Sequence, residues 1–137
     1  MKTGKVLSKK GMKNKIWLVL RQAAILRDGG KCQICYKKAD LQVDHCFTRA
    51  IGRLHFDLSN LTTLCAKCHT SKSLRKGGPV DKQVDEIVRR REGNDWWTWA
   101  LGESWKTCPE CSRVWFLEEK FIYATEKLEF YKKRWAA

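Results

Sequence analysis

The sequence predicts an α+β fold in which two short strands are flanked by helices. Two CxxC pairs, Cys32/Cys35 and Cys65/Cys68, lie around the middle of the 137-residue chain. Residues 41–46 alternate apolar and polar side chains in the manner of a strand, and residues 61–64 give a second short strand. The segments on either side carry apolar residues at helical spacing.

The two CxxC pairs supply four thiolates, which match the closed tetrahedral shell of a structural zinc ion. Each short turn presents both of its sulfurs to one metal. A chain this short has a thin core, so we expect the zinc to be required for folding. The sequence carries no leader and no long apolar run, which predicts a soluble cytoplasmic protein whose cysteines bind metal more often than they form disulfides.

Helices are predicted around this centre. Residues 16–27 place Ile16, Leu20, Ala23 and Ala24 on one face, and Gly29-Gly30 ends that helix. After the two strands and the intervening loop of residues 48–60, a helix is expected over residues 66–74. Residues 76–79, Lys-Gly-Gly-Pro, break any helix and predict a boundary.

The region beyond that boundary is predicted to be mostly helical, over residues 82–92, 95–101 and 117–135. The last helix has acidic residues at its start and basic residues at its end, which suits the helix dipole. The chain is thus divided into a basic flexible arm (1–15), a zinc-bearing domain (16–78) and a helical C-terminal appendage (79–137).

Six of the seven tryptophans lie in the C-terminal region. Trp96, Trp97 and Trp99 could offer stacking planes for unpaired bases. Core packing is the favoured interpretation, because a small, charge-balanced region needs bulky apolar side chains to build an interior.

Charge is distributed unevenly. The chain has 28 Lys+Arg and 15 Asp+Glu, and residues 1–78 hold 17 basic against 4 acidic side chains, whereas residues 79–137 hold 11 of each. All of the net charge of +13 therefore lies on the first part, which predicts a polyanionic partner and salt-sensitive binding. The arm is either a cationic segment that tracks DNA or an ordinary disordered terminus. Six basic residues near the cysteines are predicted to contact phosphates: Arg49, Arg53, Lys67, Lys72, Arg75 and Lys76.

Between and after the cysteines, the sequence resembles the HNH endonuclease superfamily. Zinc-bearing members of that family carry CxxC, then Asp-His, then Asn-Leu, then CxxC-His. The same order occurs here as Cys32–Cys35, Asp44-His45, Asn60-Leu61 and Cys65–His69. The resemblance covers roughly residues 13–76 and implies a zinc-stapled ββα-metal (HNH) core.

A narrower likeness is to the NinG group of phage recombination proteins. Residues 45–49 and 53–60 echo the spacing in that group between the active histidine and the asparagine. The chain departs from the NinG pattern at Asp44 and His69, where that group usually has glycine and asparagine. These two positions are closer to mainstream HNH enzymes.

The resemblance implies a role for each residue of the motif. His45 would be the general base that activates water. Asp44 and His69 would hold one catalytic divalent cation, Mg²⁺ or Mn²⁺, which suits a hard, oxygen-rich shell. Asn60 would orient His45 or pin the hairpin.

The predicted function is metal-dependent hydrolysis of DNA phosphodiester bonds by a phage-type HNH endonuclease. One such site cuts one strand, so cleavage of both strands would need a homodimer or two successive nicks. Two alternatives remain open: a non-catalytic zinc module that binds nucleic acid, and a structure-specific nuclease for branched recombination DNA.

The third CxxC, Cys108/Cys111, has no fourth pair to complete a metal site. It is half of a second zinc site shared across a dimer, a site completed by Cys46 or His55, or two thiols in a turn, and the sequence leaves these alternatives open. Cys46 is expected to be a buried thiol and His55 a satisfied loop histidine.

Overall fold

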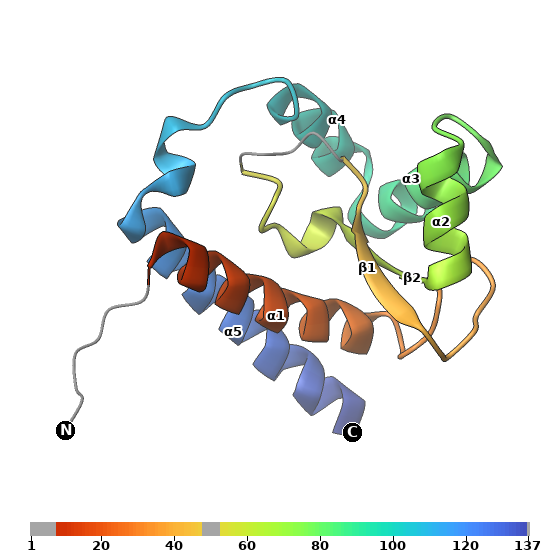
Figure 1. Cartoon of the computed structure of the whole chain (residues 1–137), viewed down its shortest axis with the longest axis horizontal. Coiled ribbons are helices and arrows are strands. Elements are labelled where there is room, and N and C mark those ends of the chain that lie inside the picture. Colours follow the sequence, from red (N-terminus) through yellow and green to blue (C-terminus); the bar gives the residue numbers. More distant parts are fainter. Residues whose placement is uncertain (1–7, 48–52, 137) are drawn as a thin grey trace.

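The computed structural model describes residues 8–47 and 53–136. In chain order its elements are α1 (Lys9–Arg27), β1 (Leu41–His45), the 3-10 turn η1 (Leu58–Asn60), β2 (Leu61–Cys65), α2 (Ala66–Leu74), α3 (Pro79–Glu92), α4 (Asn94–Glu103), the 3-10 turn η2 (Pro109–Ser112) and α5 (Val114–Ala136). The mixed α+β fold with a β1–β2–α2 core is therefore confirmed (Figure 1).

Helix α1 begins earlier than the sequence predicted. Ser8 caps it, because the Ser8 Oγ accepts a hydrogen bond from the Gly11 N–H at 3.0 Å. Residues 9–15, predicted as part of a flexible arm, are therefore helical, and the remainder of the predicted arm up to residue 7 lies outside the described residues. The helix ends at Arg27, as predicted, and is followed by Gly29 and Gly30, whose φ angles are +76° and +70°.

Strands β1 and β2 form an antiparallel pair in which Leu41 lies opposite Cys65 and His45 opposite Leu61. Every residue of β2 is buried. Helix α2 follows β2 without a connecting residue, so the end of the sheet and the first turn of the helix form one continuous support. This arrangement places the second CxxC pair at the junction of β2 and α2.

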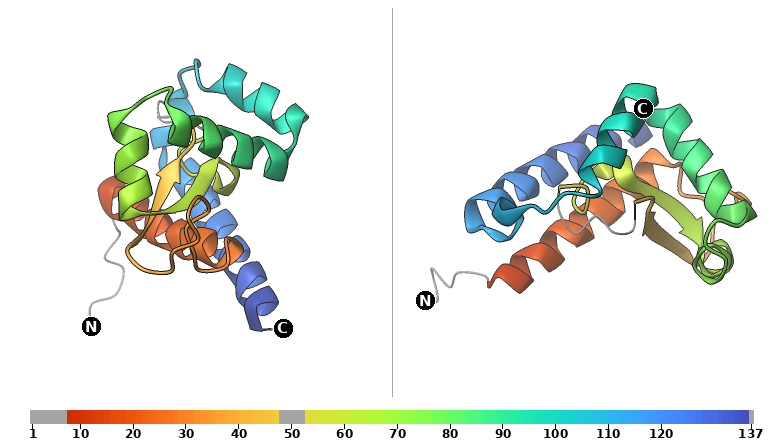
Figure 2. Two further views of the ribbon diagram at one scale, coloured as in Figure 1. Left: turned by 90° about the vertical axis from the view of Figure 1, so that its right-hand side faces the viewer. Right: turned by 90° about the horizontal axis from the view of Figure 1, so that it is seen from above.

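Helix α5 packs along α1, and the two run side by side in the same direction (Figures 1 and 2). Their contact forms the main core: Ile16 and Leu20 of α1 are fully buried with Leu117 of α5, and Val43 and Leu61 of the sheet join them. The last helix of the chain therefore packs on the first, while the predicted division of the chain at residue 78 stays a prediction.

Helices α3 and α4 follow the predicted break. Pro79 is the first residue of α3, where its missing N–H costs nothing, and Gly93 separates the two helices with a φ angle of +93°. Val84 and Val88 of α3 are fully buried in a second cluster with Cys32, Cys65 and Cys68.

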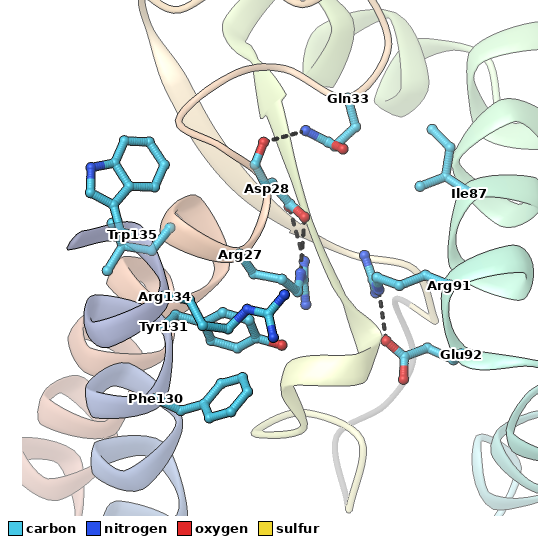
Figure 3. A pocket seen from close by; sticks show the side chains of 11 residues that line it. Arg27, Asp28, Gln33, Ile87, Arg91, Glu92, Phe130, Tyr131, Arg134 and Trp135 are labelled. Atoms are coloured by element: carbon cyan, nitrogen blue, oxygen red, sulfur yellow. Dashed lines mark hydrogen bonds and ion pairs between the residues drawn. The ribbon is translucent and has the colours of Figure 1, made fainter. Parts of the chain in front are cut away.

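The tryptophans divide between core and surface. Trp96 and Trp97 are partly buried against the α3 cluster, as the core-packing interpretation predicted. Four others are exposed, which that interpretation did not predict: Trp99, Trp105, Trp115 and Trp135. Trp135 lines a cavity that lies between the C-terminal end of α5 and helix α3 (Figure 3).

Candidate active site and zinc centre

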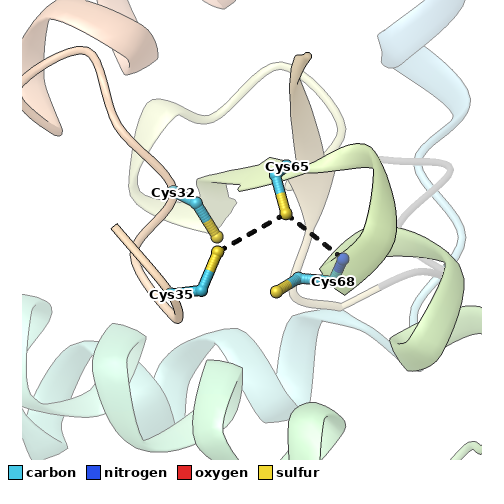
Figure 4. A group of neighbouring side chains, drawn as sticks. All are labelled: Cys32, Cys35, Cys65 and Cys68. Atoms are coloured by element: carbon cyan, nitrogen blue, oxygen red, sulfur yellow. Dashed lines mark hydrogen bonds between the residues drawn. The ribbon is translucent and has the colours of Figure 1, made fainter. Parts of the chain in front are cut away.

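Four cysteines meet at the junction of the first CxxC turn with β2 and α2 (Figure 4). The Sγ atoms of Cys32, Cys35, Cys65 and Cys68 all lie within 4.8 Å of one another, and those of Cys35 and Cys65 are 3.6 Å apart. A tetrahedral zinc with Zn–S bonds of about 2.3 Å separates its sulfurs by about 3.8 Å. The four cysteines are thus positioned to hold a metal ion, and their geometry fits a structural zinc.

Backbone hydrogen bonds favour the thiolate forms that zinc requires. Burial opposes ionisation of Cys32, but hydrogen bonds from the backbone, including the Ile34 N–H, bring its pKa down to about 7. The Cys68 N–H donates to the Cys65 Sγ at 3.4 Å and lowers the pKa of Cys65. Burial raises the pKa of Cys68, so its ionisation to the thiolate depends most on a bound cation.

Asp44 and His69 meet on the other side of α2. Asp44 comes from β1, His69 follows the last zinc cysteine on α2, and Asp44 Oδ1 lies 3.3 Å from His69 Nε2. Asp44 is buried, and its Oδ2 atom faces the Lys72 ammonium at 2.9 Å. A carboxylate beside an imidazole nitrogen is a ligand set that can hold a divalent cation, once the cation displaces the lysine.

Lys72 also reaches this pair. Its side chain is 6% exposed, and its Nζ lies 2.9 Å from Asp44 Oδ2 and 3.8 Å from a carboxylate oxygen of Asp81. The sequence predicted Lys72 as a surface contact for phosphate, and its burial contradicts that role. The ammonium instead neutralises Asp44. The signal that was missed is the spacing, because Lys72 lies three residues after His69 and therefore on the same face of α2.

The His45 ring points toward α1 rather than toward this ion pair. It stacks on Trp17, with ring centroids 5.1 Å apart, and on His55, with centroids 4.7 Å apart. Its Nε2 lies 2.9 Å from the His55 carbonyl oxygen. A carbonyl only accepts, so Nε2 carries the proton and Nδ1 is the basic nitrogen. Burial lowers the pKa of His45, which keeps the ring neutral at pH 7.

No hydrogen bond or ion pair joins the His45 ring to Asp44 or His69 in the part of the chain that the structure describes. The structure thus brings Asp44 and His69 together. His45 follows Asp44 on β1, but its ring lies apart from this pair. His55, expected to be an ordinary loop histidine, packs against His45. Nothing in its sequence surroundings indicated this, because the contact depends on the path of the loop.

Asn60 is fully buried and holds the ends of the loop together. Its Oδ1 accepts from the Phe47 N–H at 2.8 Å, and its Nδ2 donates to the carbonyl oxygens of Leu54 at 3.1 Å and Phe47 at 3.4 Å. Its backbone carbonyl accepts from the Cys46 N–H, directly after His45. Of the two roles predicted for Asn60, these contacts match the pinning of the hairpin, and its side chain makes no bond to the His45 ring.

The predicted phosphate contacts differ in availability. Lys67, Arg75 and Lys76 are exposed on or just after α2. Arg53 is partly exposed but is paired with Glu110 and lies 3.6 Å from Glu103, so two carboxylates already neutralise it. Arg49 lies outside the described residues.

The remaining cysteines play other parts. Cys108 and Cys111 form a disulfide, and the group of potential metal ligands found among the described residues does not include them. This corrects both the second zinc site and the alternative of two free thiols, since a disulfide leaves neither sulfur as a thiol or thiolate. Cys46 is a buried thiol, as predicted, and donates to Asp85 Oδ1 at 3.3 Å.

Comparison with known proteins adds a family to this geometry. In the described part of the chain, no helix is long and apolar enough to cross a membrane.

No curated protein and no solved structure matches the chain, and nothing in the comparisons supports the narrower likeness to the NinG group. The segment from the first zinc cysteine to the end of α2, residues 32–75, matches the model of the HNH endonuclease family.

Proposed function

We propose that this protein is a metal-dependent endonuclease that hydrolyses DNA phosphodiester bonds. The observation that carries the proposal is the buried Asp44 carboxylate, which lies 3.3 Å from His69 and directly before the neutral His45 in the HNH-matching segment. A carboxylate, a neutral imidazole and a second imidazole in one small region are the groups that phosphodiester hydrolysis requires.

In this proposal His45 is the general base. Its Nδ1 is free because Nε2 is bonded to the His55 carbonyl, and the low pKa of the buried ring keeps Nδ1 unprotonated. The stacked Trp17 and His55 rings hold the imidazole plane fixed, so that Nδ1 accepts the proton of a water aligned with the phosphate. Asn60 keeps the loop after β1 in position.

Asp44 Oδ2 and His69 Nε2 would hold a single Mg²⁺ or Mn²⁺. When bound, such a cation stabilises negative charge on the phosphate and on the leaving oxygen. The Lys72 ammonium already lies 2.9 Å from Asp44 Oδ2, so we expect a divalent cation to compete with Lys72 for this oxygen.

DNA is the proposed partner because the excess charge lies on residues 1–78. Lys67, Arg75 and Lys76 are exposed beside the site and free to contact phosphates, whereas Lys72 is not. Their contacts would position the backbone without reading bases, so binding would weaken with added salt.

A second candidate is a non-catalytic zinc module that binds nucleic acid. The Lys72–Asp44 ion pair favours it, since a lysine already neutralises the carboxylate that a catalytic cation would need. In that case Asp44 is structural, and His45 serves only to pack the loop against α1.

Conversion of supercoiled plasmid to nicked or linear DNA in Mg²⁺ or Mn²⁺ separates the two candidates. The comparison uses the native chain, His45→Ala and a control, Arg90→Ala, whose side chain is 81% exposed on α3, all with equal zinc content. Cutting by the native chain and the control but not by His45→Ala supports the nuclease. If all three bind DNA equally and none cuts plasmid, branched or single-stranded DNA, the binding module takes its place.

The products also test the finer proposals. Nicked plasmid alone indicates a single site acting once, whereas linear product from a dimeric species supports a homodimer. Preference for a four-way junction over linear duplex would favour the structure-specific recombination nuclease and a phage-type role. Equal cutting of both substrates would contradict that preference.

A further inference from the structure

A cavity of about 740 Å³ lies between the end of α1, helix α3 and the end of α5 (Figure 3). It shares no lining residue with the Asp44–His69 pair. Its volume falls in the range of about 300–1,000 Å³ that is usual for small-molecule sites. Its lining includes three arginines and three aromatic residues: Arg27, Arg91, Phe130, Tyr131, Arg134 and Trp135.

Three arginines from three helices face this cavity, but only part of their hydrogen-bonding capacity is used. Arg27 is occupied by Asp28 and by the carbonyl oxygens of Leu58 and Leu61. Arg91 donates through Nη2 to the carbonyl oxygens of Ser59 and Leu61, and through Nε to Glu92. These hydrogen bonds to the protein hold both guanidinium groups in place at the wall of the cavity.

Arg91 Nη1 is different. It is buried and has no hydrogen-bond partner among the described residues. Burial, and then the neighbouring charge of Arg27, lower the pKa of Arg91, so this cation is held in an unfavourable field. Because Nη1 has almost no accessible surface, it does not contact the open space directly, and Arg91 contributes its positive charge to the wall of the cavity.

Arg134 lies on the opposite wall. It is exposed, and within the described residues it makes no ion pair. Its guanidinium carbon lies 5.5 Å from the centre of the Phe130 ring, which holds the side chain against α5. Figure 3 shows Arg134 reaching over the cavity in the direction of Arg27. The rings of Phe130, Tyr131 and Trp135 occupy the same wall, and Phe130 and Trp135 are about half exposed.

We propose that this cavity binds a nucleotide. The phosphate would accept hydrogen bonds from the Arg134 guanidinium in the positive field of Arg27 and Arg91, and the base would stack on the aromatic wall formed by Phe130, Tyr131 and Trp135. Arginine forks match phosphate geometry, and aromatic rings match the face of a base, so the two features together favour a nucleotide over an acidic peptide. The nucleotide is either free or an unpaired member of a DNA strand. The proposal does not rest on hydrolysis at His45.

The test is binding of dAMP to the zinc-loaded full chain, measured by calorimetry. No Mg²⁺ or Mn²⁺ is added. The variant Arg134→Ala is compared with Lys133→Ala, which removes the same charge from the neighbouring position on α5 but does not line the cavity. We expect Arg134→Ala to weaken dAMP binding about tenfold and Lys133→Ala less than about twofold. Inorganic phosphate and deoxyadenosine separate the contributions of the phosphate and the base.

A Phe130→Leu variant tests the aromatic wall. This variant should weaken the binding of dAMP and leave the affinity for inorganic phosphate unchanged. A short single-stranded oligonucleotide is the second ligand. If it binds more tightly than dAMP, and Arg134→Ala weakens that binding, the bound nucleotide belongs to an unpaired DNA strand. Equal affinities identify the free nucleotide as the ligand. The proposal is overturned if neither ligand binds below about 1 mM, or if Arg134→Ala and Lys133→Ala have the same effect. Because no cleavage is measured, failure of the nuclease proposal leaves this result intact.

Discussion

Replacing Lys72 by methionine tests whether the buried ion pair organises the candidate cation site. Asp44 is 8% exposed and the Lys72 side chain 6%, and the charged atoms lie 2.9 Å apart. Methionine keeps most of the volume, so packing changes little, but it leaves the Asp44 carboxylate buried beside His69 without its cation. Breaking a buried pair in this way costs about 3–5 kcal/mol.

That loss is large for a small domain, whose total free energy of unfolding is about 5–15 kcal/mol. We expect urea unfolding of zinc-saturated Lys72→Met, followed by far-UV circular dichroism, to give a free energy of unfolding about 3 kcal/mol below that of the native chain. The double variant Lys72→Met with Asp44→Asn should recover most of this loss, since it leaves no buried charge. Lys67→Met, at an exposed position on α2, is the control.

The same variant reports on the cation. Without Lys72, a divalent ion meets no competitor at Asp44 Oδ2, so Mg²⁺ or Mn²⁺ should stabilise Lys72→Met more than the native chain. At a concentration of about 100 times its dissociation constant, the ion adds about 2.7 kcal/mol. If Lys72→Met is no less stable than Lys67→Met, the reasoning about the buried pair fails. If the ion stabilises the variant and the native chain equally, Asp44 is not its ligand.

Two further predictions concern the zinc centre and η1. Removing zinc with a chelator should unfold the chain, because a structural zinc contributes about 10–16 kcal/mol, comparable to the whole stability of a domain. The Cys65→Ser variant should lose the metal, whereas Cys46→Ser should retain it. A native circular dichroism spectrum without zinc would refute the prediction that zinc is required for folding. Tyr123→Phe should lower stability by about 1–3 kcal/mol, because the Tyr123 hydroxyl accepts from the Leu58 N–H at 3.0 Å. Burial and the nearby Asp57 raise the pKa of Tyr123, so its contribution is full below pH 10 and declines above it, as the unfolded chain loses that proton first. The stability gap between native and Tyr123→Phe should therefore narrow above pH 10, and a gap that stays constant in denaturation curves would contradict this.

The sequence predicted the elements of the HNH-matching segment closely. Helix α2 spans the predicted residues, and the two strands differ from prediction by one residue each. Short strands bounded by cysteine turns leave little freedom in register, which explains the agreement. The start of α1 was missed because residues 9–15 are mostly basic and include a glycine. Their helix is stabilised from outside, where Met12 packs on the core and Lys15 lies over the Phe121 ring.

The candidate site was less completely predictable. The resemblance to HNH endonucleases implied that His69 lies near Asp44, and the two side chains are 3.3 Å apart. The spacing also places Lys72 on the same face of α2 as His69, but a lysine in a basic sequence is ordinarily a surface residue, so its burial was not predicted. Its burial depends on Asp81 of α3, which the sequence places beyond a predicted boundary. The stacking of His55 on His45 likewise depends on the path of a loop, which periodicity does not encode.

The zinc centre and the candidate active site are mechanically one unit, although the zinc ligands do not touch Asp44. Cys68, a zinc ligand, is followed directly by His69, and Lys72 lies one turn further along the same helix. A fixed Cys68 thus sets the rotation of α2 about its axis, and that rotation decides whether His69 and Lys72 face Asp44 on β1. We therefore expect a zinc ion at the four cysteines to fix the orientation of α2, so that its removal separates His69 from Asp44 as the chain unfolds.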